Sequence, residues 1–333
     1  MFLDGIIETG ISTAPTGKAT ATYGYTLGGI DSSGNRYANT DRFTFSSQTN
    51  SLNTVSNLSV ARRGIAPCSD KTTYGYAAGG ETGSLNGTTT TDRTTFSSGT
   101  TAANTVSNMT FGSFLGGGLS DGGLVGYGYF MGGFTYGTIY NTTDRITFSS
   151  GTTALNTVSN LSVARNGDPG ICDNVAYGYA GGGITSAGGT GATTTTDRVT
   201  FSSGTTAANT VSNLSLARGN TAALNDGSTY GYWCGGGTST TDLSNSTTDR
   251  ITYSSGTTAS ATVSNLLMPN LRCGGITDGG EFGYVCGGYT SSSSFSSWIS
   301  RIAYSGGIGT FAFIAALLDV AVADKEGFSD HAV

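Results

Sequence analysis

The strongest constraint in this 333-residue chain is an internal repeat of about 52 residues, present six times. Each unit contains an aromatic-glycine-tyrosine motif that is followed by paired glycines. Five units have a later Asp-Arg pair, and the sixth has Ser300-Arg301 in its place. The second tyrosines of the motif are Tyr25, Tyr76, Tyr129, Tyr179, Tyr232 and Tyr284, and they step by 51, 53, 50, 53 and 52 residues. A fixed period of this length indicates a repeat architecture in which each unit buries its apolar face against the next.

Within a unit the pattern is typical of β-strands. Residues 145–149 (Arg-Ile-Thr-Phe-Ser) alternate between polar and apolar, residues 150–152 contain a glycine turn, and residues 156–163 alternate again. Residues 64–68, ahead of the second tyrosine motif, supply a further short strand. Each unit therefore predicts four strands: an inner strand, a tyrosine strand, an Asp-Arg strand and an outer strand.

Four strands in a period of about 50 residues are typical of one blade of a β-propeller. We predict an all-β, six-bladed β-propeller over residues 10–318, with four antiparallel strands per blade. Residues 10–15 are expected to form the inner strand of the first blade, residues 1–9 an N-terminal segment, and residues 319–333 a C-terminal tail. The expected blades are residues 10–61, 62–112, 113–164, 165–217, 218–271 and 272–318.

The repeat resembles the kelch family. The shared features are the paired glycines after an aromatic strand, the aromatic in Thr-Phe-Ser-Ser, and the arginine of Asn-Leu-Ser-Val-Ala-Arg, as at residues 57–62. Kelch units usually carry a tryptophan in the outer strand, whereas this chain has Val55, Val106, Val158, Val211 and Val263 nearby. The amino-acid sequence of the repeat also resembles that of kelch-type repeats in bacteriophage proteins. This resemblance implies a tail-fibre or other virion component.

Composition limits the possible partners. Charged residues make up 11% of the chain and the net charge is -6, which argues against a nucleic-acid partner because that recognition needs a basic surface. The longest apolar stretch, residues 311–323, is interrupted by Asp319 and is too short to insert into a membrane. The N-terminus lacks the pattern of an export signal. We therefore expect assembly in a host cytoplasm and a final location in a virion.

The five Asp-Arg pairs and Ser300-Arg301 recur at the same place in their units, which is expected of a structural contact and not of a single active site. We predict that these residues tie neighbouring blades together: Asp41, Arg42, Asp92, Arg93, Asp144, Arg145, Asp197, Arg198, Asp249, Arg250 and Arg301.

The loops between the paired glycines and the Asp-Arg pairs vary from unit to unit. In a kelch-like blade they emerge on one face of the disc, and a constant scaffold with variable loops is typical of a binding face. Exposed aromatics beside small polar groups suit stacking on sugars or docking on proteins. The candidate binding residues are Tyr37, Phe134, Tyr136, Tyr140, Tyr289, Phe295 and Trp298.

These features favour a non-enzymatic virion protein, such as a tail-fibre or baseplate subunit that binds host-surface glycan or protein and other virion proteins in an oligomeric assembly. A single histidine, His331, removes most catalytic triads and metal sites, so no catalytic residue, metal or cofactor is predicted. One alternative is a purely architectural capsid decoration or tail subunit. Another is a glycan-degrading enzyme of the sialidase or depolymerase type, which would need acids and tyrosines clustered at the axis; Asp121, Asp173, Asp226 and Asp278 are the acids to map.

Overall fold

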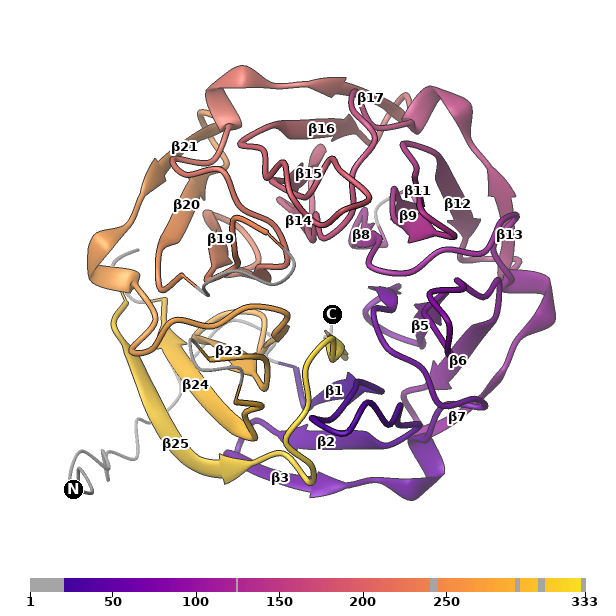
Figure 1. Cartoon of the computed structure of the whole chain (residues 1–333), viewed down its shortest axis with the longest axis vertical. Helices are drawn as coiled ribbons and strands as arrows, with labels where there is room; N and C mark the ends of the chain where they lie inside the picture. The colour runs from indigo at the N-terminus through magenta and orange to yellow at the C-terminus, as the bar shows by residue number, and fades with distance from the viewer. Residues whose placement is uncertain (1–20, 124, 240–244, 291–293, 305–308, 331–333) are drawn as a thin grey trace.

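The protein is a six-bladed β-propeller, with six four-stranded antiparallel sheets arranged around a central axis (Figure 1). A computed structural model describes residues 21–123, 125–239, 245–290, 294–304 and 309–330. Both the predicted fold class and the predicted number of strands per blade are confirmed.

Every blade has the same strand order from the axis to the rim. The inner strands are β26 (Glu326–Ser329), β4 (Ala66–Ser69), β8 (Gly117–Ser120), β14 (Gly170–Cys172), β18 (Ala222–Asn225) and β22 (Gly274–Thr277). The tyrosine strands are β1 (Tyr23–Leu27), β5 (Tyr74–Ala78), β9 (Tyr127–Met131), β15 (Tyr177–Gly181), β19 (Tyr230–Cys234) and β23 (Phe282–Cys286). The Asp-Arg strands are β2 (Thr40–Thr44), β6 (Thr91–Thr95), β12 (Thr143–Thr147), β16 (Thr196–Thr200), β20 (Thr248–Thr252) and β24 (Trp298–Ala303). The outer strands are β3 (Thr49–Leu52), β7 (Thr100–Ala103), β13 (Thr152–Leu155), β17 (Thr205–Ala208), β21 (Thr257–Ser260) and β25 (Phe311–Leu317).

The outer strand lies earlier in the unit than the sequence suggested. Strand β13 begins at Thr152, directly after Gly151, which has a φ of 68° and donates its N–H to Thr147 O at 2.8 Å. A single 3₁₀ turn then follows, so the alternation of residues 156–163 is not that of a strand. These turns are η1 (Thr54–Ser56), η2 (Thr105–Ser107), η3 (Thr157–Ser159), η4 (Thr210–Ser212) and η5 (Thr262–Ser264). A small hairpin, β10 (Phe134–Thr135) with β11 (Thr138–Ile139), extends from the third blade.

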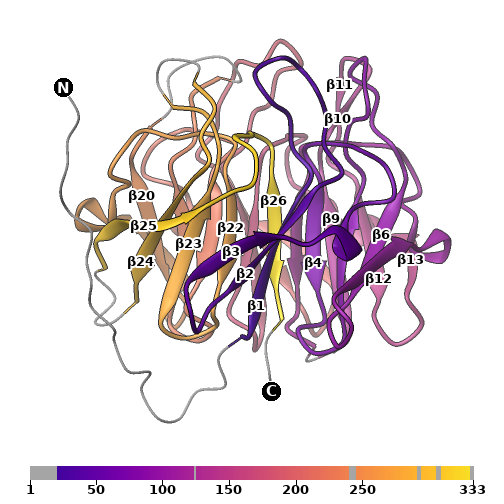
Figure 2. The same cartoon turned by 90° about the horizontal axis from the view of Figure 1, so that it is seen from below.

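The first blade takes its inner strand from the C-terminal end of the chain. Strand β26 pairs antiparallel with β1, so that Gly24 is opposite Ser329 and Leu27 is opposite Glu326. Figure 2 shows β26 running along the axis between the blades. The prediction that residues 319–333 form a tail outside the propeller is therefore wrong for β26. Residues 10–15, expected to fill this place, lie outside the described residues.

The repeated tyrosines hold neighbouring blades together. All six second tyrosines are buried, and each ring contacts an aromatic ring of the next blade: Tyr25–Phe96, Tyr76–Phe148, Tyr129–Phe201, Tyr179–Tyr253, Tyr232–Tyr304 and Tyr284–Phe45, with centroids 5.5 to 6.2 Å apart. Burial raises the pKa of Tyr25 and of Tyr179 to about 12, so these phenols stay neutral. The aromatic of Thr-Phe-Ser-Ser thus packs against the tyrosine of the preceding unit.

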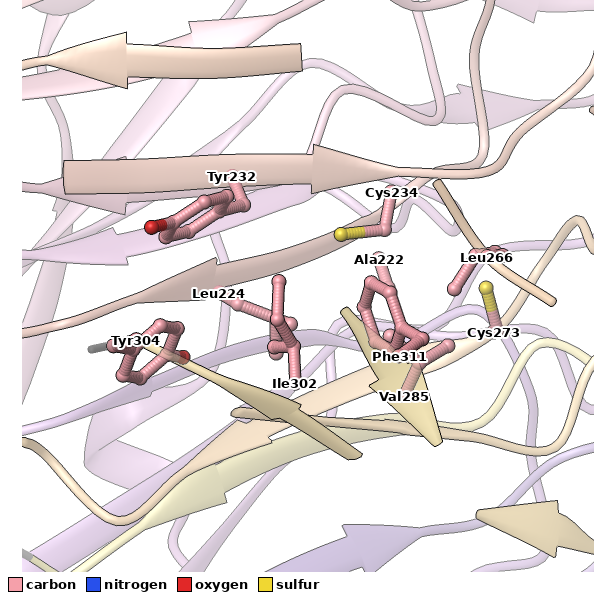
Figure 3. Close-up of a cluster of buried hydrophobic side chains, with 10 residues drawn as sticks. All are labelled: Ala222, Leu224, Tyr232, Cys234, Leu266, Cys273, Val285, Ile302, Tyr304 and Phe311. Atoms are coloured by element: carbon pink, nitrogen blue, oxygen red, sulfur yellow. The ribbon is translucent and has the colours of Figure 1, made fainter. Parts of the chain in front are cut away.

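The apolar core lies between blades and not at the axis. Figure 3 shows one such layer, where Leu224 and Tyr232 of the fifth blade pack against Val285, Ile302 and Tyr304 of the sixth. Glycine is needed where blades approach most closely. A Cβ on Gly75 would lie 2.2 Å from the ring of Phe328 in the neighbouring inner strand. The glycine of each aromatic-glycine-tyrosine motif therefore makes room for a side chain from the inner strand of the preceding blade.

Candidate binding site on the loop face

The loop face is the side of the disc that carries the loops between tyrosine strands and Asp-Arg strands, including the β10–β11 hairpin; the last described residues lie toward the opposite side (Figure 2). Six equivalent residues, each shortly before an inner strand, surround the axis here, and we call them the axial ring: Gly64, Leu115, Gly167, Asn220, Arg272 and Asp324. All six have a φ between 52° and 66°.

The axial ring is closed by backbone hydrogen bonds. Each residue donates its N–H to the carbonyl of the ring residue in the preceding unit, at distances from 2.6 to 3.0 Å, and Gly64 N completes the circle by donating to Asp324 O. Positive φ is unfavourable for Leu, Arg and Asp, and such strain is common where a site is built. The ring therefore fixes Leu115, Arg272 and Asp324 at the mouth of the axis.

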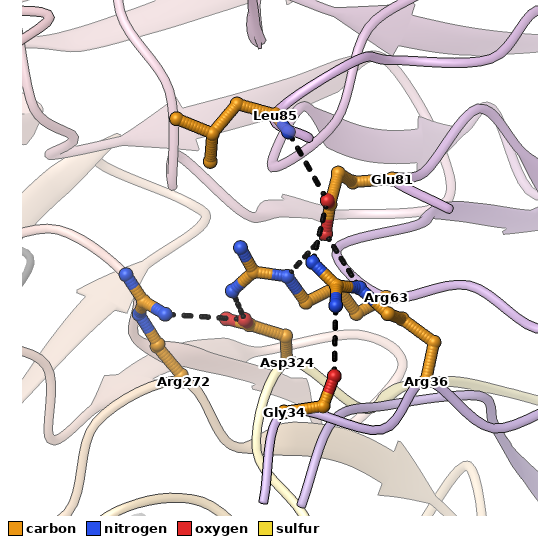
Figure 4. Close-up of polar contacts among 7 residues, drawn as sticks. All are labelled: Gly34, Arg36, Arg63, Glu81, Leu85, Arg272 and Asp324. Atoms are coloured by element: carbon orange, nitrogen blue, oxygen red, sulfur yellow. Dashed lines mark hydrogen bonds and ion pairs between the residues drawn. The ribbon is translucent and has the colours of Figure 1, made fainter. Parts of the chain in front are cut away.

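An arginine–carboxylate cluster lies beside this mouth (Figure 4). Glu81 accepts hydrogen bonds from Arg63 Nε at 2.6 Å and Arg36 Nη2 at 2.7 Å, and both Glu81 and Asp324 have side chains that are 0% exposed. Asp324 Oδ2 accepts from Arg63 Nη1 at 2.7 Å and Arg272 Nη1 at 3.2 Å. Burial alone would raise the pKa of Glu81, but hydrogen bonds from Arg36 and Arg63 lower it below its usual value. Three guanidinium groups against two carboxylates leave one positive charge in excess.

A pocket of about 210 Å³ opens next to the cluster. Arg63 and Arg272 form its charged side, while Leu85, Phe114 and Phe134 form its apolar side. The rings of Phe114 and Phe134 meet edge to face at 5.2 Å, and the Arg63 guanidinium lies 5.7 Å from the Phe114 ring centroid. The remaining lining residues include Leu115, Asn166 and the segment 186–189. The pocket thus combines cationic and aromatic surface, which suits a ligand with an anionic group on a partly apolar body.

Only some of the candidate binding aromatics lie at this pocket. Phe134 lines it, and Tyr136, 70% exposed, stands at its edge because its N–H donates to Leu85 O at 3.2 Å. Tyr289 is half-buried, contacts Phe295 with centroids 4.3 Å apart, and has the Arg272 guanidinium 5.6 Å from its ring. The other three contact residues away from the pocket. Tyr37 donates to Asp31 Oδ2, Tyr140 packs on Phe111, and Trp298, in β24, packs on Phe313.

The two members of each Asp-Arg pair have different roles. The aspartates hold the chain arriving from the preceding blade: Arg62–Asp92, Arg165–Asp197 and Arg218–Asp249 are buried ion pairs of 2.7 to 2.8 Å, and Lys325 takes the same place at Asp41. The arginines lie over the first aromatic of their own blade, 4.1 to 4.5 Å from its centroid: Arg42 over Tyr23, Arg93 over Tyr74, Arg145 over Tyr127, Arg198 over Tyr177, Arg250 over Tyr230 and Arg301 over Phe282. The arginines thus stack on an aromatic ring of their own blade, and Arg301 also donates to Gln48 Oε1 in the first blade at 2.8 Å, which is a contact between blades.

The four mapped aspartates cap turns on the face opposite to the loop face. Asp173 Oδ1 accepts the N–H groups of Val175, Ala176 and Tyr177, and Asp278 Oδ1 accepts those of Gly280, Glu281 and Phe282. Asp121 and Asp226 accept from their own turns in the same way. These residues do not make the acid cluster that a glycan-degrading enzyme would use.

The residues that do meet at the axis were missed in the sequence. Arg63 and Glu81 belong to the second unit, Arg272 to the sixth and Asp324 to the C-terminal end of the chain, and none belongs to the repeated motif. The signal in the sequence was departure from the repeat. Arg63 is a second arginine directly after the repeated Arg62. Asn270 occupies the place of that repeated arginine in its own unit, and Arg272 follows two residues later. Charged residues that occur in one unit and not in the others therefore mark this cluster.

Comparison with known proteins gives a fold likeness. No protein-family model matches the chain, and no curated protein matches its sequence. Among solved structures, the chain is similar to that described as "Structure of YjhT", with a TM-score of 0.67 and 9% sequence identity over 91% of this chain and 100% of the other. At this identity, the likeness establishes the six-bladed propeller and not the activity.

This likeness corrects the expectation that the protein is not an enzyme. A fold of this kind can host many unrelated functions, enzymes included, so the lack of histidine in the repeats does not exclude catalysis. Among the described residues, no group of three or more His, Cys, Asp or Glu side chains is placed to hold a metal ion. No helix in the described part of the chain is long and apolar enough to cross a membrane.

Proposed function

We propose that this propeller acts on an anionic glycan, which it takes up at the loop-face pocket. The observation that carries the proposal is the pairing of Arg63 and Arg272 with the apolar side chains of Leu85, Phe114 and Phe134 around one hollow. Sugars present apolar C–H faces that pack on aromatic rings, and a carboxylate or sulfate group pairs with guanidinium. The positive excess of the cluster supports an anionic over a neutral ligand.

The arrangement also leaves donors for a ligand. Arg63 donates a hydrogen bond from Nε to Glu81 and one from Nη1 to Asp324, and Arg272 donates one from Nη1 to Asp324. Because a guanidinium carries five N–H donors, part of each fork remains for an incoming acid. The internal carboxylates hold the forks in place, so that little ordering is needed when the ligand binds.

An array of acidic and neutral glycans tests the proposal, followed by titration calorimetry on the glycans that bind. Arg272→Gln should weaken binding of an acidic glycan by about tenfold or more, since a hydrogen bond to a charged group contributes about 1.5–3 kcal/mol. Arg198→Gln, which removes a guanidinium that lies over Tyr177, is the matched control and should bind normally. Equal binding of acidic and neutral glycans, or none of either, would sink the proposal.

The same titrations can report catalysis. Incubating the protein with each bound glycan and measuring released sugar by mass spectrometry separates an enzyme of the sialidase or depolymerase type from a protein that only holds its ligand. Activity that depends on Arg272 supports an enzyme that uses this pocket.

We also propose a setting for this function, a virion component that meets the host surface and contacts other tail or baseplate proteins. The resemblance of the repeat sequence to repeats of bacteriophage proteins supports this setting. Mass spectrometry of purified particles, combined with competition of adsorption by the purified protein, tests this setting. Absence of the chain from particles would reject it and leave the glycan proposal standing.

A further inference from the structure

The rim of the sixth blade differs from the rims of the other five blades. Its outer strand β25, at the edge of the disc in Figure 1, has seven residues, whereas each of the other outer strands has four. Trp298 stands where the other units have a threonine or an asparagine. Phe313 stands where they have leucine, alanine or serine. One blade therefore carries large apolar side chains at a rim that is otherwise made mostly of small ones.

These side chains form an apolar surface that we call the rim patch: Leu267, Met268, Trp298, Phe313 and Leu317. The Trp298 ring packs edge to face on Phe313, with centroids 5.0 Å apart, and Leu317 lies opposite Trp298 in the strand register. Met268 lines a small hollow together with Trp298 and Phe313. Leu267 is 53% exposed, Leu317 50% and Trp298 45%. Exposed apolar side chains that are contiguous in this way mark an interaction site.

The free edge of β25 adds backbone groups to the rim patch. β25 is the last strand of its sheet, and no strand in the described part of the chain pairs with its outer side. Edge strands are commonly protected from pairing by shortness, charge or proline. The other outer strands are short, but β25 has none of these protections, since residues 311–317 contain neither a charged residue nor a proline. Its edge is therefore a template for pairing with another strand.

A second copy of this chain fits the rim patch. Two copies of one strand pair antiparallel about a two-fold axis, so the edge of β25 is complementary to itself. The chain has a net charge of -6, so two copies repel each other, and the uncharged rim patch adds nothing to that repulsion. The exposed Asp319 lies two residues beyond Leu317. Antiparallel pairing keeps the two Asp319 carboxylates at opposite ends of the contact.

The size of the rim patch matches a weak dimer. A large side chain that is half exposed offers on the order of 100 Å². The five side chains thus provide roughly 400 Å² per copy, about half of the ~800 Å² that each partner contributes to a stable complex. We therefore expect a reversible dimer with a dissociation constant on the order of 10 μM.

We infer that the rim patch and the free edge of β25 form a two-fold interface between two copies of this chain. The rim patch shares no residue with the loop-face pocket, so this inference is independent of the proposed function. Each dimer carries two loop-face pockets, which strengthens attachment to a surface that presents many ligands.

Sedimentation velocity over protein concentrations from about 1 to about 300 μM tests the inference. The mass of the parent protein should rise from the 33.7 kDa monomer toward twice that value. Leu317→Lys should weaken association at least about tenfold, because pairing would bury a charge that has no partner. Leu155→Lys is the matched control, since Leu155 is a 49% exposed leucine in outer strand β13 of the third blade. This control should dimerise like the parent, and equal melting temperatures show that both variants fold.

Tryptophan fluorescence locates the contact. The chain has two tryptophans and Trp233 is fully buried, so a change in emission with concentration reports on Trp298. Emission should shift to shorter wavelengths as the parent dimerises and stay constant in Leu317→Lys. A parent that remains monomeric over the whole range overturns the inference, and leaves the rim patch to residues 1–20 or to another protein. Dimerisation that Leu317→Lys leaves unchanged, or that Leu155→Lys also abolishes, overturns it as well, because the contact is then not specific to the sixth blade.

Discussion

Lys325 and Asp41, 284 residues apart in the chain, form a buried ion pair that joins the last strand to the first blade. Three other blades make the equivalent contact with an arginine that lies three residues earlier in the unit, as in Arg218–Asp249. In the last unit that earlier place is occupied by Val322, whose carbonyl accepts from Gly288 N as the carbonyl of Arg218 accepts from Gly183 N. The closing unit thus reaches the same aspartate from a different position.

Removing this cation should destabilise the ring. Lys325→Met leaves Asp41 buried and uncompensated, for which we expect a loss of about 3–5 kcal/mol in the free energy of unfolding. Lys325→Arg keeps the charge and should cost much less. Urea unfolding at neutral pH measures both, and a Met variant within about 0.5 kcal/mol of the parent, the range of ordinary surface changes, would contradict the role of the pair.

Truncation before β26 should open the propeller. A chain that ends at residue 325 loses the inner strand of the first blade and also Asp330, whose Oδ1 accepts the N–H groups of Thr22 at 2.8 Å and Tyr23 at 2.6 Å. We expect the loss to reach the net stability of a typical domain, about 5–15 kcal/mol, so the single cooperative transition should disappear. Calorimetry checks this, with a chain that ends at residue 330 as the control. A cooperative transition in the shorter chain would show that β26 is dispensable.

The third blade offers a stabilising substitution. Asp144 lacks the arginine that the corresponding aspartates have, because Ser113 stands in that place, and burial raises the pKa of Asp144 even though hydrogen bonds from Thr110 oppose the rise. Gly133 leaves the same space beside Ser113 that Gly80 leaves beside Arg62. Ser113→Arg should therefore raise the free energy of unfolding at neutral pH by about 1–3 kcal/mol, the value of hydrogen bonds to charged groups.

The reverse change is the control for that variant. Arg218→Ser should strand Asp249 and cost about 3–5 kcal/mol. If Ser113→Arg instead lowers the melting temperature while Arg218→Ser does as expected, the guanidinium does not reach Asp144.

Stability should fall with pH because of Asp168. Its pKa rises from 3.8 to about 8 through burial, so between these values the folded protein holds a proton that the unfolded chain has released. Stability contributed by this proton is complete below pH 4 and is lost as the pH rises through 8, at up to about 1.4 kcal/mol per pH unit. Asp168→Asn removes the effect, and its advantage over the parent should grow from pH 5 to pH 9 in urea unfolding. A constant difference across that range would contradict the shifted pKa.

The sequence predicted the propeller because a fold made of six similar units has a repeat of nearly constant length in its sequence. The tyrosines and aspartates could be placed in strands for the same reason, because the tyrosine recurs in six units and the aspartate in five. The closing strand was missed because β26 departs from its equivalents: the charged residue Glu326 stands where other units have a small residue, such as Ala66 or Gly117. Side chains that occur once, such as Arg272, gave no periodic signal, and their meeting at the axis depends on closure of the whole ring.

The axial ring has a consequence for how such a protein can change. Its six backbone bonds form a circuit in which every position is geometrically alike, yet the side chains displayed there are Gly, Leu, Gly, Asn, Arg and Asp. The circuit uses no side-chain atom, so the side chains at Leu115, Asn220, Arg272 and Asp324 can be exchanged without breaking it, whereas a Cβ at Gly64 or Gly167 would press on the next ring residue. A lineage of such propellers can therefore acquire a new ligand by altering single residues, one unit at a time, while the scaffold that presents them stays the same.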